Sequence, residues 1–196
     1  MLMIALPQAL WCGSEQVEFT EHRHYGDGMA RSFDVSVQSD AGLAEILRAF
    51  GDRDYWHARL AAYAGAGATL DRLAVDAAGS AMVTVTLRLL RDRLPALVTQ
   101  LYPGDLTMVR NETWRPDSSD VVRGDIRVAV PGAPVSAHGR ATLTPRAAGS
   151  QLVCRTTVRV AVPFVGGKLE DYLGRQFRDG MPAIQHFTAQ WIAERR

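Results

Sequence analysis

The chain has 196 residues, of which 47% are hydrophobic and 22% are charged, the composition of an ordinary globular protein. A single domain of this size buries roughly 70% of its unfolded surface, so it needs neither a disulfide nor a metal ion to hold its fold. The net charge of +1 creates no overall field that would recruit nucleic acid or an anionic membrane. Cys12 and Cys154 are far apart and suggest no disulfide framework.

The first 28 residues differ from the rest of the chain. Residues 1–13 are apolar, but no Lys or Arg precedes them, as a secretory signal requires, and they are too few to span a bilayer. Residues 14–28 are polar and lack a regular period. We therefore expect residues 1–28 to be a disordered or mis-annotated extension. Residues 29–196 are expected to form a single domain in the cytoplasm, with no membrane span.

The domain begins with a strand and two short helices. Apolar and polar residues alternate over residues 31–38, which predicts a strand. A helical pattern over residues 43–50 ends at Gly51, and Asp52 is placed to cap a second helix that runs to residue 63.

Six further strands are predicted, separated by Gly, Pro, Asp and Ser residues of the kind that form turns. They cover residues 68–75, 81–90, 106–115, 121–130, 135–144 and 151–162. Residues 94–104 link two of these strands and are expected to hold one or two helical turns. The hydrophobic period then changes to 3.6, which predicts a long helix over residues 168–194. Pro182 predicts a kink or a break in that helix near Gly180.

This order of elements predicts an α+β fold of the helix-grip type. Strands joined by tight turns are mostly antiparallel, and the last helix alone is long enough to cover one face of their sheet. The expected architecture is a curved seven-stranded antiparallel sheet, with two short helices after its first strand and the long C-terminal helix over its concave face.

The chain also resembles a known group of proteins through motifs spread over residues 31–192. These motifs are YWHARLAAY (55–63), LPALV (94–98), NETW (111–114), PGAPVSAHGRATLTP (131–145), VPFVGGKLE (162–170) and FTAQW (187–191). They resemble the START-like, or SRPBCC, superfamily, which includes the birch-pollen allergen family, and within it a domain-of-unknown-function family of high-GC bacteria. The superfamily resemblance implies a central hydrophobic cavity and a lipid-like or aromatic ligand. The narrower family implies no defined activity, so no catalytic residue is inferred from it.

The strand over residues 106–115 carries an unusual charged pair. Its alternation places Arg110 and Glu112 on the same face as the large apolar side chains of Met108 and Trp114. The pair either lines a cavity and orients the polar end of a ligand, or reaches water at a twisted edge, or serves only as a structural ion pair.

The predicted ligand-binding residues are those that the expected strands and the long helix direct toward one another. They are Met108, Arg110, Glu112, Trp114, Ile126, Val128, Tyr172, Leu173, Phe177 and Ile184. Small residues on the same faces, Gly124, Ala137, Gly139 and Ala141, favour an open cavity. The alternative is that Phe177 and Trp191 fill the space. No sequence pattern indicates a catalytic residue, a metal site or a cofactor.

We therefore expect a non-enzymatic protein that binds, carries or senses a small hydrophobic ligand. One alternative is an enzyme of the cyclase or dehydratase type, for which Arg110 and Glu112 are the visible acid–base pair. Another is a protein- or RNA-interaction module that uses the arginines of the opposite sheet face. A solvated sheet face explains those arginines more simply at a net charge of +1, so no nucleic-acid partner is expected. The sequence carries no signal for an oligomeric state.

Overall fold

The computed structural model describes residues 18–23, 30–64, 67–94, 96–117 and 120–196. The strands are β1 (Glu18–Arg23), β2 (Ala30–Ser39), β3 (Ala68–Val75), β4 (Ala81–Leu89), β5 (Leu106–Asp117), β6 (Val121–Ala129), β7 (Val135–Pro145) and β8 (Ser150–Val160). The helices are α1 (Leu43–Phe50), α2 (Arg53–Tyr63), α3 (Ala96–Leu101) and α4 (Gly166–Ala193), with a 3-10 turn, η2 (Arg91–Arg93), before α3.

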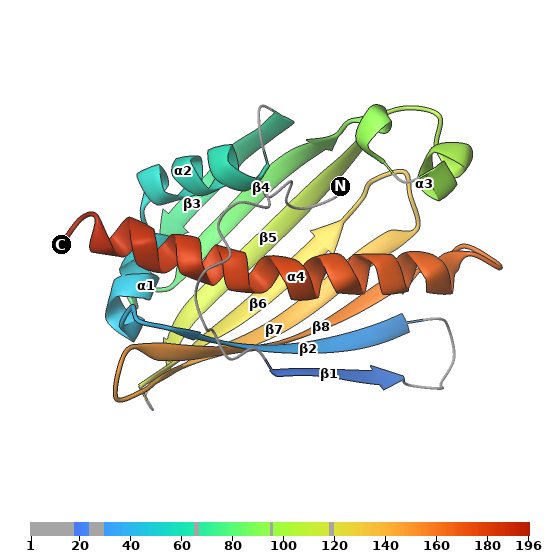
Figure 1. Cartoon of the computed structure of the whole chain (residues 1–196). Helices are drawn as coiled ribbons and strands as arrows, with labels where there is room; N and C mark the ends of the chain where they lie inside the picture. Colours follow the sequence, from blue (N-terminus) through green and yellow to red (C-terminus); the bar gives the residue numbers. More distant parts are fainter. Residues whose placement is uncertain (1–17, 24–29, 65–66, 95, 118–119) are drawn as a thin grey trace.

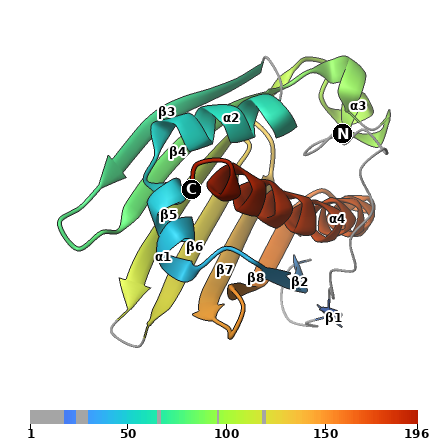
Figure 2. The ribbon, with the colours of Figure 1, turned by 60° about the vertical axis from the view of Figure 1, so that its left-hand side comes forward.

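All of these strands belong to one antiparallel sheet, in the order β1-β2-β8-β7-β6-β5-β4-β3. From β3 to β8 each strand pairs with its neighbour along the chain, and β2 pairs with β8. The sheet curves, and α4 lies across its concave face (Figures 1 and 2). The predicted α+β helix-grip architecture, with its seven curved antiparallel strands, is confirmed.

The sheet contains one strand more than the sequence predicted. The additional strand, β1, lies at the edge and pairs with β2 from Glu18↔Ser36 to Arg23↔Arg31. It falls within the segment that we expected to be a disordered or mis-annotated extension, residues 1–28. The other residues of that segment lie outside the described part of the chain. The domain boundary at residue 29 stays a prediction.

Helix α2 begins at the cap that the sequence predicted, and α1 begins at a glycine. Asp52 caps α2, because its Oδ1 accepts a hydrogen bond from the backbone N–H of Asp54 at 2.7 Å. At α1 the cap is Gly42, whose N–H donates to Glu45 Oε2 at 3.0 Å. Ser39 lies shortly before it, where its Oγ accepts from Ala41 N. These caps turn the chain from β2 directly into the two helices that cover one end of the sheet (Figure 1).

Helix α4 is continuous over 28 residues, so the predicted break near Gly180 does not occur. Pro182 lies inside the helix, where it removes one backbone donor. Both Gly180 and Pro182 are buried, and packing of a buried face is what stabilises most helices in proteins. Within the described residues, no helix combines the length and the apolar character needed to cross a membrane.

A close contact fixes α4 over one side of the sheet. The Phe33 ring, which projects from β2, lies against Gly174 of α4 so closely that a Cβ atom at position 174 would overlap the ring. Val158, Val160 and Leu169 pack beside this ring. Because α4 approaches the sheet at β2 and β8, the space between α4 and strands β5 to β7 is left less filled.

Replacing Gly174 by Ala is expected to lower the free energy of unfolding by about 1–3 kcal/mol, because the added methyl group has no space beside Phe33. Helix propensity alone would favour Ala over Gly. Gly167→Ala is the matched control in the same helix, since its Cβ would lie 3.5 Å from the nearest atom, Arg31 Nη2. Urea unfolding measures both variants, and equal stability of the two would contradict the contact.

Candidate functional site

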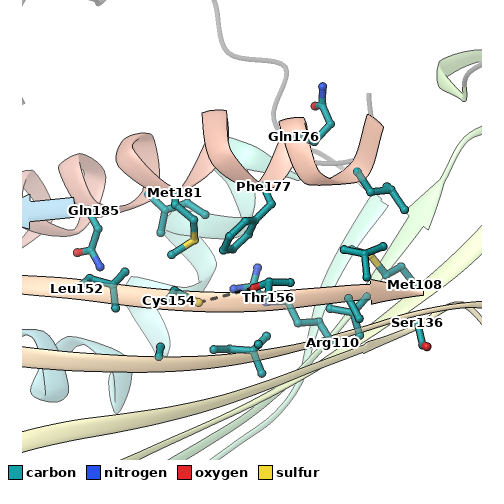
Figure 3. Close-up of a pocket in the computed structure, with 18 of the residues that line it drawn as sticks. Met108, Arg110, Ser136, Leu152, Cys154, Thr156, Gln176, Phe177, Met181 and Gln185 are labelled. Carbon is teal, nitrogen blue, oxygen red and sulfur yellow. Dashed lines mark hydrogen bonds between the residues drawn. The ribbon is translucent and has the colours of Figure 1, made fainter. Parts of the chain in front are cut away.

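The candidate site is a cavity of about 130 Å³ between α4 and strands β5 to β8. A single water needs only ~10–15 Å³, so this space accommodates a small organic molecule. The sheet contributes Met108, Arg110, Trp114, Ile126, Val128, Val130, Val135, Ser136, Ala137, Gly139, Ala141, Leu152, Cys154, Thr156 and Val158. The helices contribute Phe50, Arg59, Leu173, Gln176, Phe177, Met181, Ile184 and Gln185. Figure 3 shows Phe177, Met181 and Gln185 extending from α4 toward the sheet.

Eight of the ten residues predicted to bind ligand line this cavity: Met108, Arg110, Trp114, Ile126, Val128, Leu173, Phe177 and Ile184. Phe177 forms part of the cavity wall and does not fill the space, and Trp191 packs instead in the core beside Tyr55. The expectation of an open cavity is therefore confirmed. The binding role of these residues stays a prediction.

Glu112 and Tyr172 are placed differently from what the sequence suggested. Glu112 is 2% exposed and lies behind Arg110, outside the cavity lining. Tyr172 precedes Leu173 on α4 and is rotated away from the main cavity, so it lines a smaller adjoining one. That cavity is also lined by Val98 and Leu101 of α3, in the predicted linker.

The charged pair of β5 points inward and forms part of a buried cluster. Arg110 Nη2 lies 2.5 Å from Glu112 Oε1, and Arg59 Nη2 of α2 lies 3.7 Å from the same oxygen. The other carboxylate oxygen of Glu112 accepts a hydrogen bond from Trp114 Nε1 at 2.8 Å. The side chain of Arg110 keeps 15% exposure against 1% for Glu112, so the guanidinium, not the carboxylate, lines the cavity.

Electrostatics keep Glu112 ionised. Burial alone raises a carboxyl pKa, but Arg110, Arg59 and the hydrogen bond from Trp114 hold the pKa of Glu112 below its usual value. Burial lowers the pKa of Arg110, and Arg59 lowers it further, while Glu112 opposes both effects. An arginine nevertheless stays protonated in a protein. The cluster is therefore built from two cations and one anion.

The small residues of the sheet do not all contribute to the cavity. A Cβ atom on Gly124 would lie 2.5 Å from the Trp114 ring, so this ring occupies the space that the missing side chain leaves. The expectation that Gly124 leaves volume unfilled is therefore wrong. In contrast, Ala137, Gly139 and Ala141 do line the cavity. The small size of these residues leaves space next to the larger rings of Phe177 and Trp114, which also line the cavity.

Cys154 is a neutral wall residue. It is 2% exposed, and its Sγ lies 3.7 Å from Thr156 Oγ1, the contact drawn in Figure 3. Burial raises the pKa of the Cys154 thiol to about 11. A nucleophilic thiol needs a lowered pKa, so its environment is that of a structural residue, as the sequence suggested.

The sequence reading missed several polar residues of the cavity, and Arg59 and Gln185 are two of them. Arg59 follows Tyr55 and Trp56 by four and three residues, so all three share one helical face, and its guanidinium lies 4.7 Å from the centre of the Trp56 ring. That spacing was the available signal. Gln185 follows Ile184, and its Oε1 is buried with no hydrogen-bond partner.

Solved structures with the same architecture resemble this chain. The di-domain ARO/CYC StfQ from the steffimycin biosynthetic pathway superimposes with a TM-score of 0.52 and 14% identity, covering 85% of this chain and 51% of that one. For Ara h 8.0201 the TM-score is 0.51 and the identity 11%, with 85% and 99% covered. For TTHA0849 from Thermus thermophilus they are 0.50 and 13%, with 83% and 97% covered. At these identities the likeness concerns the fold alone.

Relatives in sequence are closer. Uncharacterized protein Rv0481c of Mycobacterium tuberculosis (strain ATCC 25618 / H37Rv) is 39% identical over 170 residues, which cover 84% of this chain and 98% of that protein. Uncharacterized protein Mb0491c of Mycobacterium bovis matches with the same values. The model of the family described as "Protein of unknown function (DUF2505)" matches residues 34–192. This chain therefore belongs to the DUF2505 family.

Proposed function

We propose that this protein binds a small, mainly apolar molecule in the cavity beneath α4, and that it carries or senses this molecule without transforming it. The observation that carries the proposal is the cavity of about 130 Å³ itself, because protein interiors are otherwise packed without voids of this size. Its wall is mostly apolar with a few polar groups, which is the usual character of a small-molecule site. Desolvation of apolar ligand surface would supply most of the affinity.

The charge arrangement supports binding over catalysis. In the alternative of a cyclase or dehydratase, Glu112 would serve as the acid or base. Its carboxylate faces Arg110 and Arg59 and accepts from Trp114, so both oxygens are engaged outside the cavity lining. A catalytic acid at neutral pH needs a raised pKa, whereas the pKa of Glu112 is lowered. The likeness to an ARO/CYC structure adds a shared scaffold only.

The outer sheet face gives less support to an interaction module. Arg123, Arg127 and Arg155 each form an ion pair with a carboxylate on the same face, those of Asp117, Asp125 and Asp34. His138 Nε2 also contacts Asp125. This pairing weakens the positive field that binding to phosphate groups would need. The cavity is therefore the better candidate for the functional site.

Ala137→Leu is expected to weaken binding of N-phenyl-1-naphthylamine, a neutral fluorescent apolar probe, by at least about ten-fold, or ~1.4 kcal/mol. Ala137 lines the cavity, so the larger side chain takes up space that a ligand would occupy. The thermal midpoint should hold or rise, because filling a cavity commonly stabilises a fold. Fluorescence titration measures the affinity, and native mass spectrometry of freshly purified protein identifies any apolar molecule that is already bound.

Ala129→Leu is the matched control, because Ala129 is exposed on the neighbouring strand β6 and lies outside the cavity lining. This variant should bind the probe as the wild-type protein does. Failure of the wild-type protein to take up the probe, together with no co-purified molecule, would contradict the proposed function. Equal binding by both variants would place the probe outside this cavity.

A further inference from the structure

The buried cluster beneath the cavity is not electrically balanced. Arg59 and Arg110 contribute two positive charges, and Glu112 contributes one negative charge. Across the described residues, Glu112 is the one carboxylate within ion-pair distance of either guanidinium. An uncompensated buried charge costs several kcal/mol unless a partner neutralises it. The cluster thus favours the arrival of one more negative charge.

Arg110 is the cation of the cluster that keeps an unpaired hydrogen-bond donor. Its Nη2 faces Glu112, but its Nε is buried and has no hydrogen-bond partner. Arg59 differs, because its guanidinium also lies over the Trp56 ring. Since Arg110 lines the cavity, a molecule in the cavity is the partner that can reach it. An N–H donor of a guanidinium pairs best with a carboxylate-like oxygen.

The other described polar side chains near Arg110 do not supply the missing negative charge. Burial raises the pKa of the Cys154 thiol to about 11 and raises the pKa of Tyr55 as well, so both groups stay uncharged at neutral pH. The other polar groups of the cavity wall are also uncharged, namely those of Ser136, Thr156, Gln176 and Gln185.

The other end of the cavity is suited to an apolar group. Val130, Val135 and Leu173 line both the main cavity and the smaller one beneath α3, so the two spaces adjoin. The rest of the smaller wall is made of Leu, Val and Ala side chains with Tyr102 and Tyr172. The combined space therefore passes from a cationic region at Arg110 to an apolar region near α3.

We propose that the ligand class of this protein is a carboxylic acid with an apolar body, a proposal that rests on the binding function above. The ligand carboxylate pairs with the Arg110 guanidinium, which lines the cavity, and neutralises the cluster. The apolar body lies along Val130, Val135 and Leu173 toward α3. Arg110 thereby selects an acid over a neutral molecule of the same shape.

Octanoate and octan-1-ol test this selection, since they share a chain length and differ in charge. Each is titrated at pH 7 against wild-type protein that holds N-phenyl-1-naphthylamine, and the displacement constants are compared. An apolar cavity without an unpaired cation would prefer the alcohol, because an unpaired carboxylate is far costlier to bury than a hydroxyl. We expect the opposite order, with octanoate binding at least about ten-fold more tightly.

Arg110→Met removes the cation and leaves Arg59 and Glu112 as a neutral pair. In this variant octanoate should lose at least about ten-fold in affinity, while octan-1-ol is held as well as before. Arg127→Met is the matched control: it changes the net charge equally, but Arg127 is exposed and lies on the outer face, paired with Asp125. This control should keep the wild-type preference for octanoate.

The outcomes separate the two proposals. Suppose that the wild-type protein holds the neutral probe but that octanoate binds no more tightly than octan-1-ol. The acid selection is then overturned and the binding function stands. The same conclusion applies if neither compound displaces the probe. If the neutral probe does not bind at all, the binding function itself fails. The wild-type comparison decides the matter even if Arg110→Met does not fold. An equal loss of preference in Arg127→Met would also overturn the role of Arg110.

Discussion

Replacing Glu112 by Gln is expected to lower the free energy of unfolding by about 3–5 kcal/mol, the usual cost of removing one partner from a buried ion pair. The substitution keeps the size of the side chain and an acceptor for Trp114 Nε1, but it removes the only carboxylate near Arg110 and Arg59 in the described structure. Two guanidinium groups would then face each other without an anion. Urea unfolding, followed by tryptophan fluorescence, measures the loss.

Arg110→Met is the informative comparison for this loss. It removes one cation of the same cluster and leaves Arg59 with Glu112, a balanced pair. Its cost should therefore be clearly smaller than that of Glu112→Gln, although it deletes a larger polar group. If Arg110→Met proved the more damaging of the two substitutions, the cluster would not be an excess of positive charge held by one carboxylate.

The pH dependence provides a second check on the same carboxylate. The pKa of Glu112 is lower in the folded protein than in the unfolded chain, where it is about 4.3. Its contribution to stability is thus fully present above the unfolded pKa and is lost as the pH falls through the folded pKa. The stability difference between wild type and Glu112→Gln should therefore be constant near neutral pH and shrink below about pH 4. A difference that grows on acidification would contradict the assignment.

The strands and the long helix were predictable because each has a regular local hydrophobic period, which is 2 in a strand and 3.6 in a helix. In β5, the alternation that put Met108, Arg110 and Trp114 on one face holds in three dimensions, since all three line the cavity. Strand β1 was not predictable in the same way. Its sequence, EFTEHR, is mostly ionisable and offers no repeated apolar position, and its pairing with β2 depends on the edge that the rest of the sheet provides.

Details of the site were less accessible, because they depend on which side chain fills which space. The sequence shows that Gly124 is small, but not that the Trp114 ring lies over it. It places Glu112 on the inward face, yet only the position of Arg110 and Arg59 shows that the carboxylate sits behind the cavity wall. The periodic pattern of the sequence thus predicts which face a side chain is on, but it does not predict how side chains pack across strands and helices.

A second large effect is expected at the aromatic cluster that joins α2 to α4. Tyr55 is fully buried, and its ring centre lies 5.4 Å from that of Trp191 and 6.0 Å from that of Phe187. Its hydroxyl lies 2.9 Å from Thr188 Oγ1 on α4. Tyr55→Ala should lower the free energy of unfolding by about 3–5 kcal/mol, as other large aromatic deletions in cores do. Thermal and urea unfolding measure the change.

Two further substitutions test which part of this effect comes from the Tyr55 hydroxyl and whether another tyrosine of α2 has the same effect. Tyr55→Phe removes the hydroxyl, which contacts Thr188 and also interacts with the Arg59 guanidinium, so it should cost about 1–3 kcal/mol. Tyr63→Ala deletes a second α2 ring that also contacts Phe187. Because Tyr63 is only half-buried, this variant should lose less stability than Tyr55→Ala.

Tyr55→Ala should also affect the cavity. Because α2 carries Arg59, the substitution should loosen the positioning of that guanidinium and weaken probe binding in the cavity. Equal costs for the two alanine variants would show that α2 is not held through Tyr55.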